Sequence, residues 1–252
     1  MASFYLKALF YTNLVRTNMA LDHSETYKRL TVRNIPHILR KKQLEKQIKN
    51  LPTNCQIYSD FGCSNGYLTN GFSKFLSPNK TIGYDANVEN IEIASASYPE
   101  LNFATIDLNR PNMLDEKSEA ITCFETLEHV GDIPNAVQTI KNACQPGARI
   151  LISVPIEIGF WGVIKYLLKR FIFRYDLPLN CGDQTYFFAL LTGKDISQYR
   201  KPAKGYGTHF GFDYRVVDEI ISSKFNNSHI LKFNNFTSRF YLVNVNNSDI
   251  AQ

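Results

Sequence analysis

The chain has 252 residues, 44% of them hydrophobic and 20% charged, and its formal net charge is +5. A chain of this length can bury a full core, so we expect a single domain over residues 1–252. The charge is too small to indicate a nucleic-acid partner. The sequence also contains no run of 18 apolar residues that could span a membrane.

The cysteines and histidines point away from disulfides and metals. The five cysteines include no C-x-x-C pair and their number is odd, which favours free thiols in a reducing compartment. The five histidines are scattered, so no metal-ligand spacing is present. The apolar run within residues 1–20 is broken by Thr12 and Asn13 and makes a poor secretory signal. These features predict a cytoplasmic protein without a metal site.

Residues 1–50 are expected to form an N-terminal helical extension. Within it, residues 28–49 hold eight Lys or Arg against one Glu. We interpret this region as a solvated helix ahead of the first strand, in a position to close over a ligand. Because its basic residues are not interleaved with stacking aromatic residues, it does not indicate nucleic-acid binding.

From residue 55 onward, strand-like and helix-like segments alternate. Strand-helix-strand units at this spacing predict right-handed crossovers and a doubly wound, mostly parallel, Rossmann-like sheet. The last of the three helices is expected to end at the Pro146-Gly147 pair. The predicted strands are 55–60, 81–84, 101–106, 120–124 and 149–154, and the predicted helices are 65–76, 87–98 and 133–145.

Two further strands, 230–233 and 239–245, are separated by a short turn and are expected to form an antiparallel hairpin. The whole chain is therefore predicted to be an α/β protein with a seven-stranded sheet. Residues 156–212 do not fit the alternation, and we interpret them as a cap inserted after the fifth strand. Such an insertion lies over the carboxyl ends of parallel strands, where ligands bind.

The cap is expected to begin with a helix at 160–175 and to continue as an aromatic region interrupted by Pro and Gly. This helix has no acidic residue, and its basic residues fall on one half of a helical wheel, opposite most of the large apolar residues. The commoner arrangement of such a helix packs the apolar face on the sheet and leaves the basic face solvated. The alternative is peripheral contact with an anionic membrane through 160–175. The basic residues are Lys165, Lys169, Arg170 and Arg174.

A glycine-bearing turn follows the first predicted strand, in the sequence Asp-Phe-Gly-Cys-Ser-Asn-Gly at 60–66. Glycine permits tight turning and close approach of the backbone to a ligand. Asp85 and Asp107 end the next two strands; one can accept hydrogen bonds from a ribose diol and the other from an exocyclic amine. The carboxylate of Asp60 would repel a pyrophosphate and attract an ammonium or sulfonium group. It could also turn away to hold the loop.

Five segments, in this order and at this spacing, resemble the motifs of the class I S-adenosylmethionine-dependent methyltransferases, small-molecule branch. They are residues 60–66, 83–85, 104–108, 123–130 and 147–155. The chain departs from the family at Ser64, where a glycine is usual. This departure raises the odds of an inactive homologue, although serine is small enough for the turn.

The resemblance implies S-adenosylmethionine as cofactor and assigns a role to each motif. Asp60 and the turn would hold the methionine part of the cofactor, and Asp85 the ribose. The third motif would contact adenine, and the fourth would line the pocket near the sulfonium. The implied cofactor-binding residues are Asp60, Gly62, Cys63, Gly66, Asp85, Asp107, Leu108, Phe124 and Glu125.

An oxygen nucleophile would need a general base to take its proton, and His129 and His209 are the candidates. For both, a purely structural role stays open. Glu128 is interpreted as a surface or helix-start residue. The predicted function is O-methylation of a sugar, glycan or lipid-linked small molecule, with the aromatic cap as a groove for the acceptor.

Two other functions stay open. One is a non-catalytic homologue that binds the cofactor or a partner, for which Ser64 is the only support. The other is an NAD-dependent oxidoreductase, which Asp60 and the lack of an unbroken G-x-G-x-x-G disfavour.

Overall fold

The computed structural model describes residues 27, 35–172, 181–200, 210–235 and 237–250. Its centre is a seven-stranded sheet in the order β3-β2-β1-β4-β5-β7-β6. The first five strands of this order are parallel, and β7 pairs antiparallel with both β5 and β6. The strands are β1 (Ile57–Phe61), β2 (Lys80–Asp85), β3 (Asn102–Thr105), β4 (Ser118–Phe124), β5 (Cys144–Pro155), β6 (His229–Asn235) and β7 (Ser238–Asn244). The predicted parallel sheet with a C-terminal hairpin is confirmed.

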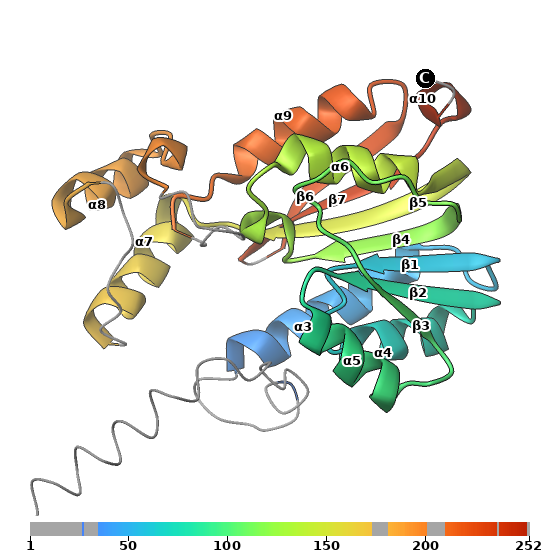
Figure 1. Cartoon of the computed structure of the whole chain (residues 1–252). Coiled ribbons are helices and arrows are strands. Elements are labelled where there is room, and N and C mark those ends of the chain that lie inside the picture. Colours follow the sequence, from blue (N-terminus) through green and yellow to red (C-terminus); the bar gives the residue numbers. More distant parts are fainter. Residues whose placement is uncertain (1–26, 28–34, 173–180, 201–209, 236, 251–252) are drawn as a thin grey trace, which may run out of the picture.

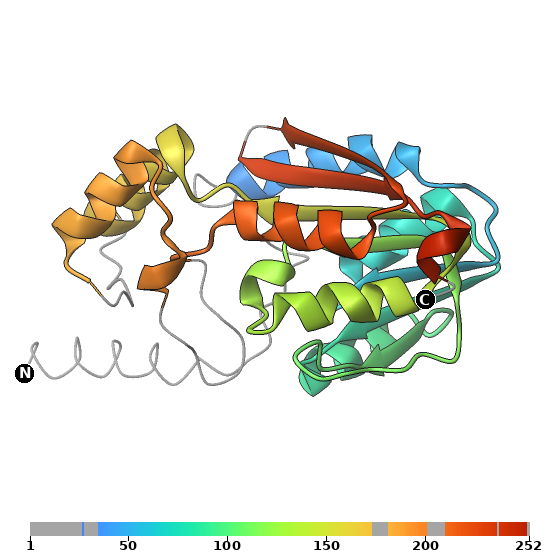
Figure 2. The same cartoon turned by 90° about the horizontal axis from the view of Figure 1, so that it is seen from above.

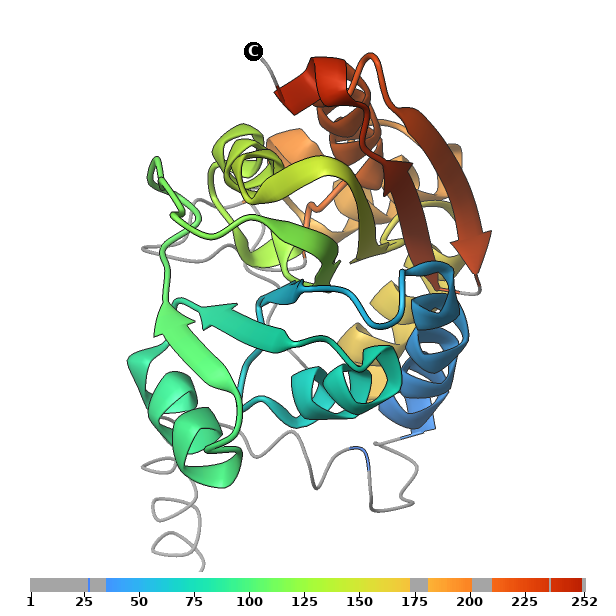
Figure 3. The same ribbon diagram turned by 90° about the vertical axis from the view of Figure 1, so that its right-hand side faces the viewer.

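Helices cover both faces of the sheet, as Figures 1 and 3 show, so the doubly wound prediction is also confirmed. One face carries α3 (Ile35–Gln47) with the short η1 (Ile48–Asn50), α4 (Tyr67–Leu76) and α5 (Val88–Ser97). The other carries α6 (Ile133–Asn142) and α9 (Tyr214–Lys224), and the short α10 (Asn247–Ile250) lies beside the start of β5. Each face has its own apolar core, one with Leu44, Phe72 and Leu76 and the other with Val137 and Val217.

The boundary between α6 and β5 differs from the prediction. The helix ends at Asn142 rather than 145, and Pro146-Gly147 lie inside β5. Pairing explains the difference, because Cys144 already pairs with Ser118, while Arg149 pairs with Ala120 across a register irregularity. The residues between these two pairs include Pro146-Gly147, at which the helix was expected to end. Strand pairing therefore overrides the helix-compatible pattern.

The cap begins directly after β5 with α7 (Gly159–Leu167), which continues as a π-helical turn, η3 (Leu168–Ile172). It also holds α8 (Asp183–Thr192) and the short η4 (Ser197–Tyr199); the sequence did not predict α8. The ring of Tyr166 packs on those of Tyr186 and Phe187, which joins α7 to α8. Figures 1 and 2 show α7 and α8 projecting beyond the sheet at the carboxyl end of β5. Residues 173–175 of the predicted helix lie outside the described residues.

Candidate cofactor and active site

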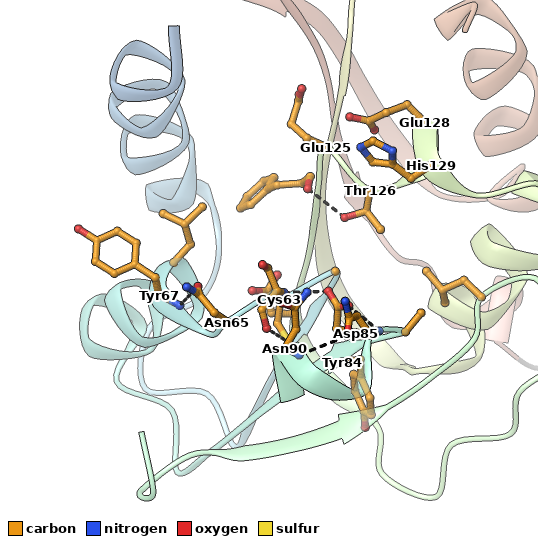
Figure 4. A pocket seen from close by; sticks show the side chains of 18 of the residues that line it. Cys63, Asn65, Tyr67, Tyr84, Asp85, Asn90, Glu125, Thr126, Glu128 and His129 are labelled. Carbon is orange, nitrogen blue, oxygen red and sulfur yellow. Dashed lines mark hydrogen bonds between the residues drawn. The ribbon is translucent and has the colours of Figure 1, made fainter. Parts of the chain in front are cut away.

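A cavity of about 420 Å³ lies at the carboxyl ends of β1 to β4. The loops that follow these strands line it, together with residues from the N-terminal region, and Figure 4 shows many of these side chains. Its volume is in the range of small-molecule and cofactor sites. Of the predicted site residues, Asp60, Gly62, Cys63, Asp85, Leu108, Phe124, Glu125 and His129 line this cavity.

The glycine turn fits only because two of its residues lack a Cβ. Gly62 has φ +82°, and a Cβ there would lie 1.9 Å from Oγ1 of Thr126, in the loop after β4. Gly66 has φ +76°, and a Cβ there would lie 2.8 Å from the ring of Phe103 on β3. The turn therefore passes between two neighbouring elements at distances that no other residue type allows.

The amide groups of the turn are used within the fold. The backbone N–H groups of Gly62 and Cys63 both donate to the carbonyl oxygen of Tyr84, at 2.7 and 2.9 Å. The Cys63 thiol is buried, which raises its pKa well above the usual range. The amides of Gly62 and Cys63 and the thiol of Cys63 therefore serve the fold and not a ligand.

Ser64, the residue that departs from the family pattern, adopts the left-handed conformation with φ 49°. This conformation costs a non-glycine residue about 1–2 kcal/mol. The Ser64 amide donates to Oδ2 of Asp85 at 2.9 Å. The turn thus keeps its shape with serine in place of glycine, and it positions Asp85 directly.

Asp85 ends β2 with its carboxylate on the cavity. Besides the Ser64 amide, it accepts a hydrogen bond from the Asn87 amide on Oδ1 at 2.9 Å. A carboxylate has about four lone-pair sites, so each oxygen can accept one more hydrogen bond. This geometry suits two adjacent hydroxyl groups.

Asp60 is buried and ties three elements together. Its carboxylate accepts hydrogen bonds from Oγ1 of Thr69 on α4 at 2.6 Å and from Oγ1 of Thr122 on β4 at 2.7 Å. Burial raises the pKa of Asp60 from 3.8 to about 6. The carboxylate thus holds the loop, as one of the two interpretations expected. Its contact with the methionine part stays a prediction.

Replacing Asp60 by asparagine is expected to remove a pH dependence of stability. Because the native pKa is the higher one, the native state keeps a proton between about pH 4 and 6 that the unfolded state has released. The free energy of unfolding of the wild type therefore falls as pH rises through this window and is flat above it. The Asp60→Asn variant should lack this fall and be more stable by about 3 kcal/mol at pH 7.

Denaturant titrations from pH 4 to 8 measure this effect. The amide of the variant can donate to Thr122, whose hydroxyl already bonds that of Tyr58, in a pair where either can be the donor. Asp115→Asn, at an exposed carboxylate, is the matched control and should retain the wild-type profile. An unchanged fall in Asp60→Asn would contradict the assignment.

The third motif reaches the cavity through its apolar residues. Leu108 lines the wall and is buried, whereas Asp107 is not among the lining residues. The Asp107 carboxylate instead accepts hydrogen bonds from Asn109 and lies 3.3 Å from Nε of Arg110. Its contact with adenine stays a prediction that would need this side chain to turn.

The fourth motif brings an acidic residue against a cation from the N-terminal region. Glu125 follows β4 with φ 49° and accepts a hydrogen bond from Oγ of Ser153 at 3.1 Å. Its Oε2 lies 3.3 Å from Nη2 of Arg40 on α3. The Nε of Arg40 is buried and has no hydrogen-bond partner among the described residues.

Sequence reasoning missed Arg40, Tyr27 and His37 as lining residues. The basic helix is not simply solvated, because Arg40 points into the domain. The ring of Tyr27 also stacks on that of Tyr67, with centroids 5.7 Å apart, and both residues line the cavity. That the N-terminal region closes over a bound ligand stays a prediction. The basic sequence of residues 28–49 does not indicate which of its cations points into the domain.

Glu128 is fully buried, so it is not a surface residue, but its place in a short helical turn agrees with the other interpretation, a helix-start residue. It lies in the 3₁₀ turn η2 (Leu127–His129) and lines the cavity. Burial raises the pKa of Glu128 well above its usual range, and the nearby charge of Glu125 adds to this effect. Figure 4 shows the imidazole of His129 beside Glu128. His209 lies outside the described residues.

Within the described ranges, no group of three or more His, Cys, Asp and Glu side chains is arranged to hold a metal ion. In the same part of the chain, no helix is long and apolar enough to cross a membrane.

A sheet in this order, with a glycine turn after β1 and a carboxylate at the end of β2, defines an α/β protein that binds a nucleoside cofactor. Residues 34–172, more than half of the chain, match the family described as Methyltransferase domain. The chain therefore belongs to this methyltransferase family. The match confirms the prediction of a methyltransferase that uses S-adenosylmethionine, and the small-molecule branch stays a prediction.

Curated relatives match parts of the chain. The 235L protein of Invertebrate iridescent virus 6, named a methyltransferase, is 27% identical over 127 residues, which are 48% of either chain. The ubiquinone biosynthesis O-methyltransferase of Colwellia psychrerythraea is 30% identical over 103 residues, which are 37% of this chain and 39% of that protein. This chain thus matches about half or less of the length of these relatives.

Solved structures show the same fold over most of the chain. An S-adenosylmethionine-dependent methyltransferase from Clostridium acetobutylicum aligns with a TM-score of 0.51 and 14% identity, over 97% of this chain and 99% of that one. The PH0226 protein of Pyrococcus horikoshii aligns with a TM-score of 0.57 and 11% identity, over 88% and 98%.

The lining residues suit the cofactor of the family. Asp85 has lone pairs for the ribose diol, and Arg40, which also lines the cavity, is a cation with one buried Nε donor that has no partner among the described residues. A buried guanidinium N–H without a partner costs free energy, so a ligand carboxylate at this point would stabilise it.

Proposed function

We propose that the protein transfers the methyl group of S-adenosylmethionine to a hydroxyl oxygen of a sugar, a glycan or a lipid-linked small molecule. The observation that carries this proposal is the placement of Asp85, Arg40 and His129 around one cavity. The similarity to a protein named as an O-methyltransferase supports an oxygen acceptor.

Each residue has a distinct task in this proposal. Asp85 binds the ribose hydroxyls, and Arg40 binds the carboxylate of the methionine part. The carbonyl oxygens of the glycine turn accept hydrogen bonds from its ammonium group. When bound, the cofactor supplies an activated methyl group, so the chain has mainly to position the acceptor and exclude water.

We assign to His129 the role of the general base that takes the proton of the acceptor hydroxyl. It lines the cavity directly after the strand that brings Phe124 and Glu125 to the same wall. A neutral imidazole can take a proton near pH 7. The acceptor would enter from the side of the cap, whose Arg200 donates a hydrogen bond to the backbone carbonyl of Glu128.

We also place this activity in the cytoplasm. All five cysteines are free thiols in the structure, and four of them are buried. A reducing compartment suits such thiols, because their oxidation would disturb the core.

Two measurements test the proposal. Calorimetry should detect binding of S-adenosylmethionine and S-adenosylhomocysteine and not of NAD. Methyl-labelled cofactor should then transfer its label to an added glycan or lipid-linked acceptor, and His129→Asn should lower kcat about 100-fold or more while leaving affinity for S-adenosylhomocysteine unchanged. Cofactor binding without label transfer to any acceptor class would favour the non-catalytic homologue, and binding of NAD alone would refute the proposal.

A further inference from the structure

The first helix of the cap turns basic residues toward the domain, whereas the commoner arrangement would leave them in solvent. Lys165 and Lys169 lie on the side that faces the domain, where they form ion pairs with the buried Glu157 at 3.0 and 3.5 Å. Arg170 pairs with Asp183 of α8 at 2.7 Å. The basic half of α7 and η3 is therefore paired with two carboxylates and is not simply solvated.

Val163 and Tyr166 of the same segment pack into the core of the cap, whereas other apolar side chains face outward. Phe160 is 73% exposed and Phe171 is 70% exposed, and Leu167 and Leu168 are each about 40% exposed. We call these four side chains the outer apolar patch. Phe160 and Leu167 lie seven residues apart, two helical turns, and so share one face of α7.

The outer apolar patch has the size and place of a contact surface. Its side chains expose on the order of 400 Å², as large as the patches that are often functional on monomers. The patch lies on the part of the molecule that projects farthest from the sheet along β5 (Figures 1 and 2). The ring of Phe160 packs edge-on against that of Trp161, with centroids 5.5 Å apart, and most of its surface is still exposed.

Size and charge indicate what covers the patch. A stable interface between two protein copies buries roughly 800 Å² on each side, about twice what the patch offers. The segment α7–η3 contains no acidic residue, and Lys169 and Arg170 remain partly exposed, with 27% and 39% of their side chains accessible. Three cations, Lys165, Lys169 and Arg170, lie beside two carboxylates, Glu157 and Asp183, so these described groups carry one positive charge in excess. An apolar patch with such an excess complements an anionic lipid surface.

We propose that the outer apolar patch docks the cap on the surface of an anionic lipid bilayer, with Phe160 and Phe171 inserted at the boundary between headgroups and acyl chains. Lys169 and Arg170 then lie at the level of the headgroups. This inference is independent of the cofactor pocket. In this orientation, the face of the cap that carries the outer apolar patch lies against the bilayer.

Vesicle co-sedimentation of the full chain tests the inference. The wild type should bind vesicles of phosphatidylcholine with one quarter phosphatidylglycerol more tightly than vesicles of phosphatidylcholine alone. Phe160→Ser/Phe171→Ser should lower the partition coefficient at least tenfold. Val88→Ser/Met113→Ser, at exposed apolar residues of α5 and of the segment before β4, is the matched control and should bind as the wild type does.

Both double variants replace exposed side chains, so their unchanged thermal unfolding and cofactor binding separate a docking defect from misfolding. Absence of wild-type binding to either vesicle would overturn the inference, as would wild-type binding by the Phe variant. Equal binding to the two vesicle types would refute the anionic preference. A wild-type dimer in sedimentation that only the Phe variant dissociates would assign the patch to a second copy instead.

Discussion

Replacing Arg40 by glutamine is expected to weaken binding of S-adenosylhomocysteine by ten- to a hundredfold. The reason is that the buried guanidinium has an Nε donor without a partner beside the cavity, and a charge-assisted hydrogen bond to a ligand carboxylate is worth about 1.5–3 kcal/mol. Glutamine keeps a polar side chain of similar reach but carries no charge. Isothermal titration calorimetry gives the two affinities directly.

A ligand without the carboxylate separates this contact from a general disturbance of the pocket. 5′-Methylthioadenosine carries the same adenosine but no amino acid part, so its affinity should be equal for wild type and Arg40→Gln. Arg110→Gln, at an arginine with 82% of its side chain exposed, is the control for loss of positive charge. If both ligands lost affinity together, Arg40 would be holding Glu125 in place and not binding the carboxylate.

Gly62→Ala is expected to have the largest effect on stability. The new methyl group would lie 1.9 Å from Oγ1 and 2.8 Å from Cβ of Thr126, and the residue would keep a φ near +82°. Left-handed strain and overpacking together cost roughly 3 kcal/mol or more. Chemical denaturation should show this loss, and cofactor binding should fall with it, because the clash moves the wall after β4.

A second substitution isolates the clash from the strain. Thr126→Gly removes all three atoms that the new methyl group would meet, so the double variant should recover the overpacking part of the loss and keep the strain part. Gly71→Ala is the control, because a Cβ at that helical position has nothing within 4 Å and should stabilise α4 slightly. Additive effects of the Gly62 and Thr126 substitutions would show that the two residues do not collide.

The sheet and half of the cofactor site could be predicted because their signals are local. Alternating segments specify a parallel sheet, and residues that end consecutive parallel strands must meet at one edge. This reasoning placed the glycine turn, Asp85, Phe124 and Glu125 on one cavity. The end of α6 was harder to predict from the sequence, because the pairing of Cys144 with Ser118 is a long-range contact that competes with a good helical pattern.

The parts that escaped prediction depend on contacts between distant segments. Nothing in the run 28–49 distinguishes Arg40 from its neighbours until Glu125 is brought beside it. Similarly, a helical wheel divides α7 into a basic and an apolar half but does not say which half faces the domain. That choice is made by Glu157 and Asp183, whose positions follow from the end of β5 and from the unpredicted α8.

The anchoring of α3 has a thermodynamic consequence for ligand binding. Leu44, one turn beyond Arg40 in α3, and Ile48, at the start of η1, are both buried in the apolar core on this face of the sheet. The helix that presents this guanidinium is thus ordered when the domain folds, and its conformational entropy is lost at that stage. Cofactor binding then needs no coupled folding of α3, and the associated heat-capacity change reflects only the surface that the ligand itself buries.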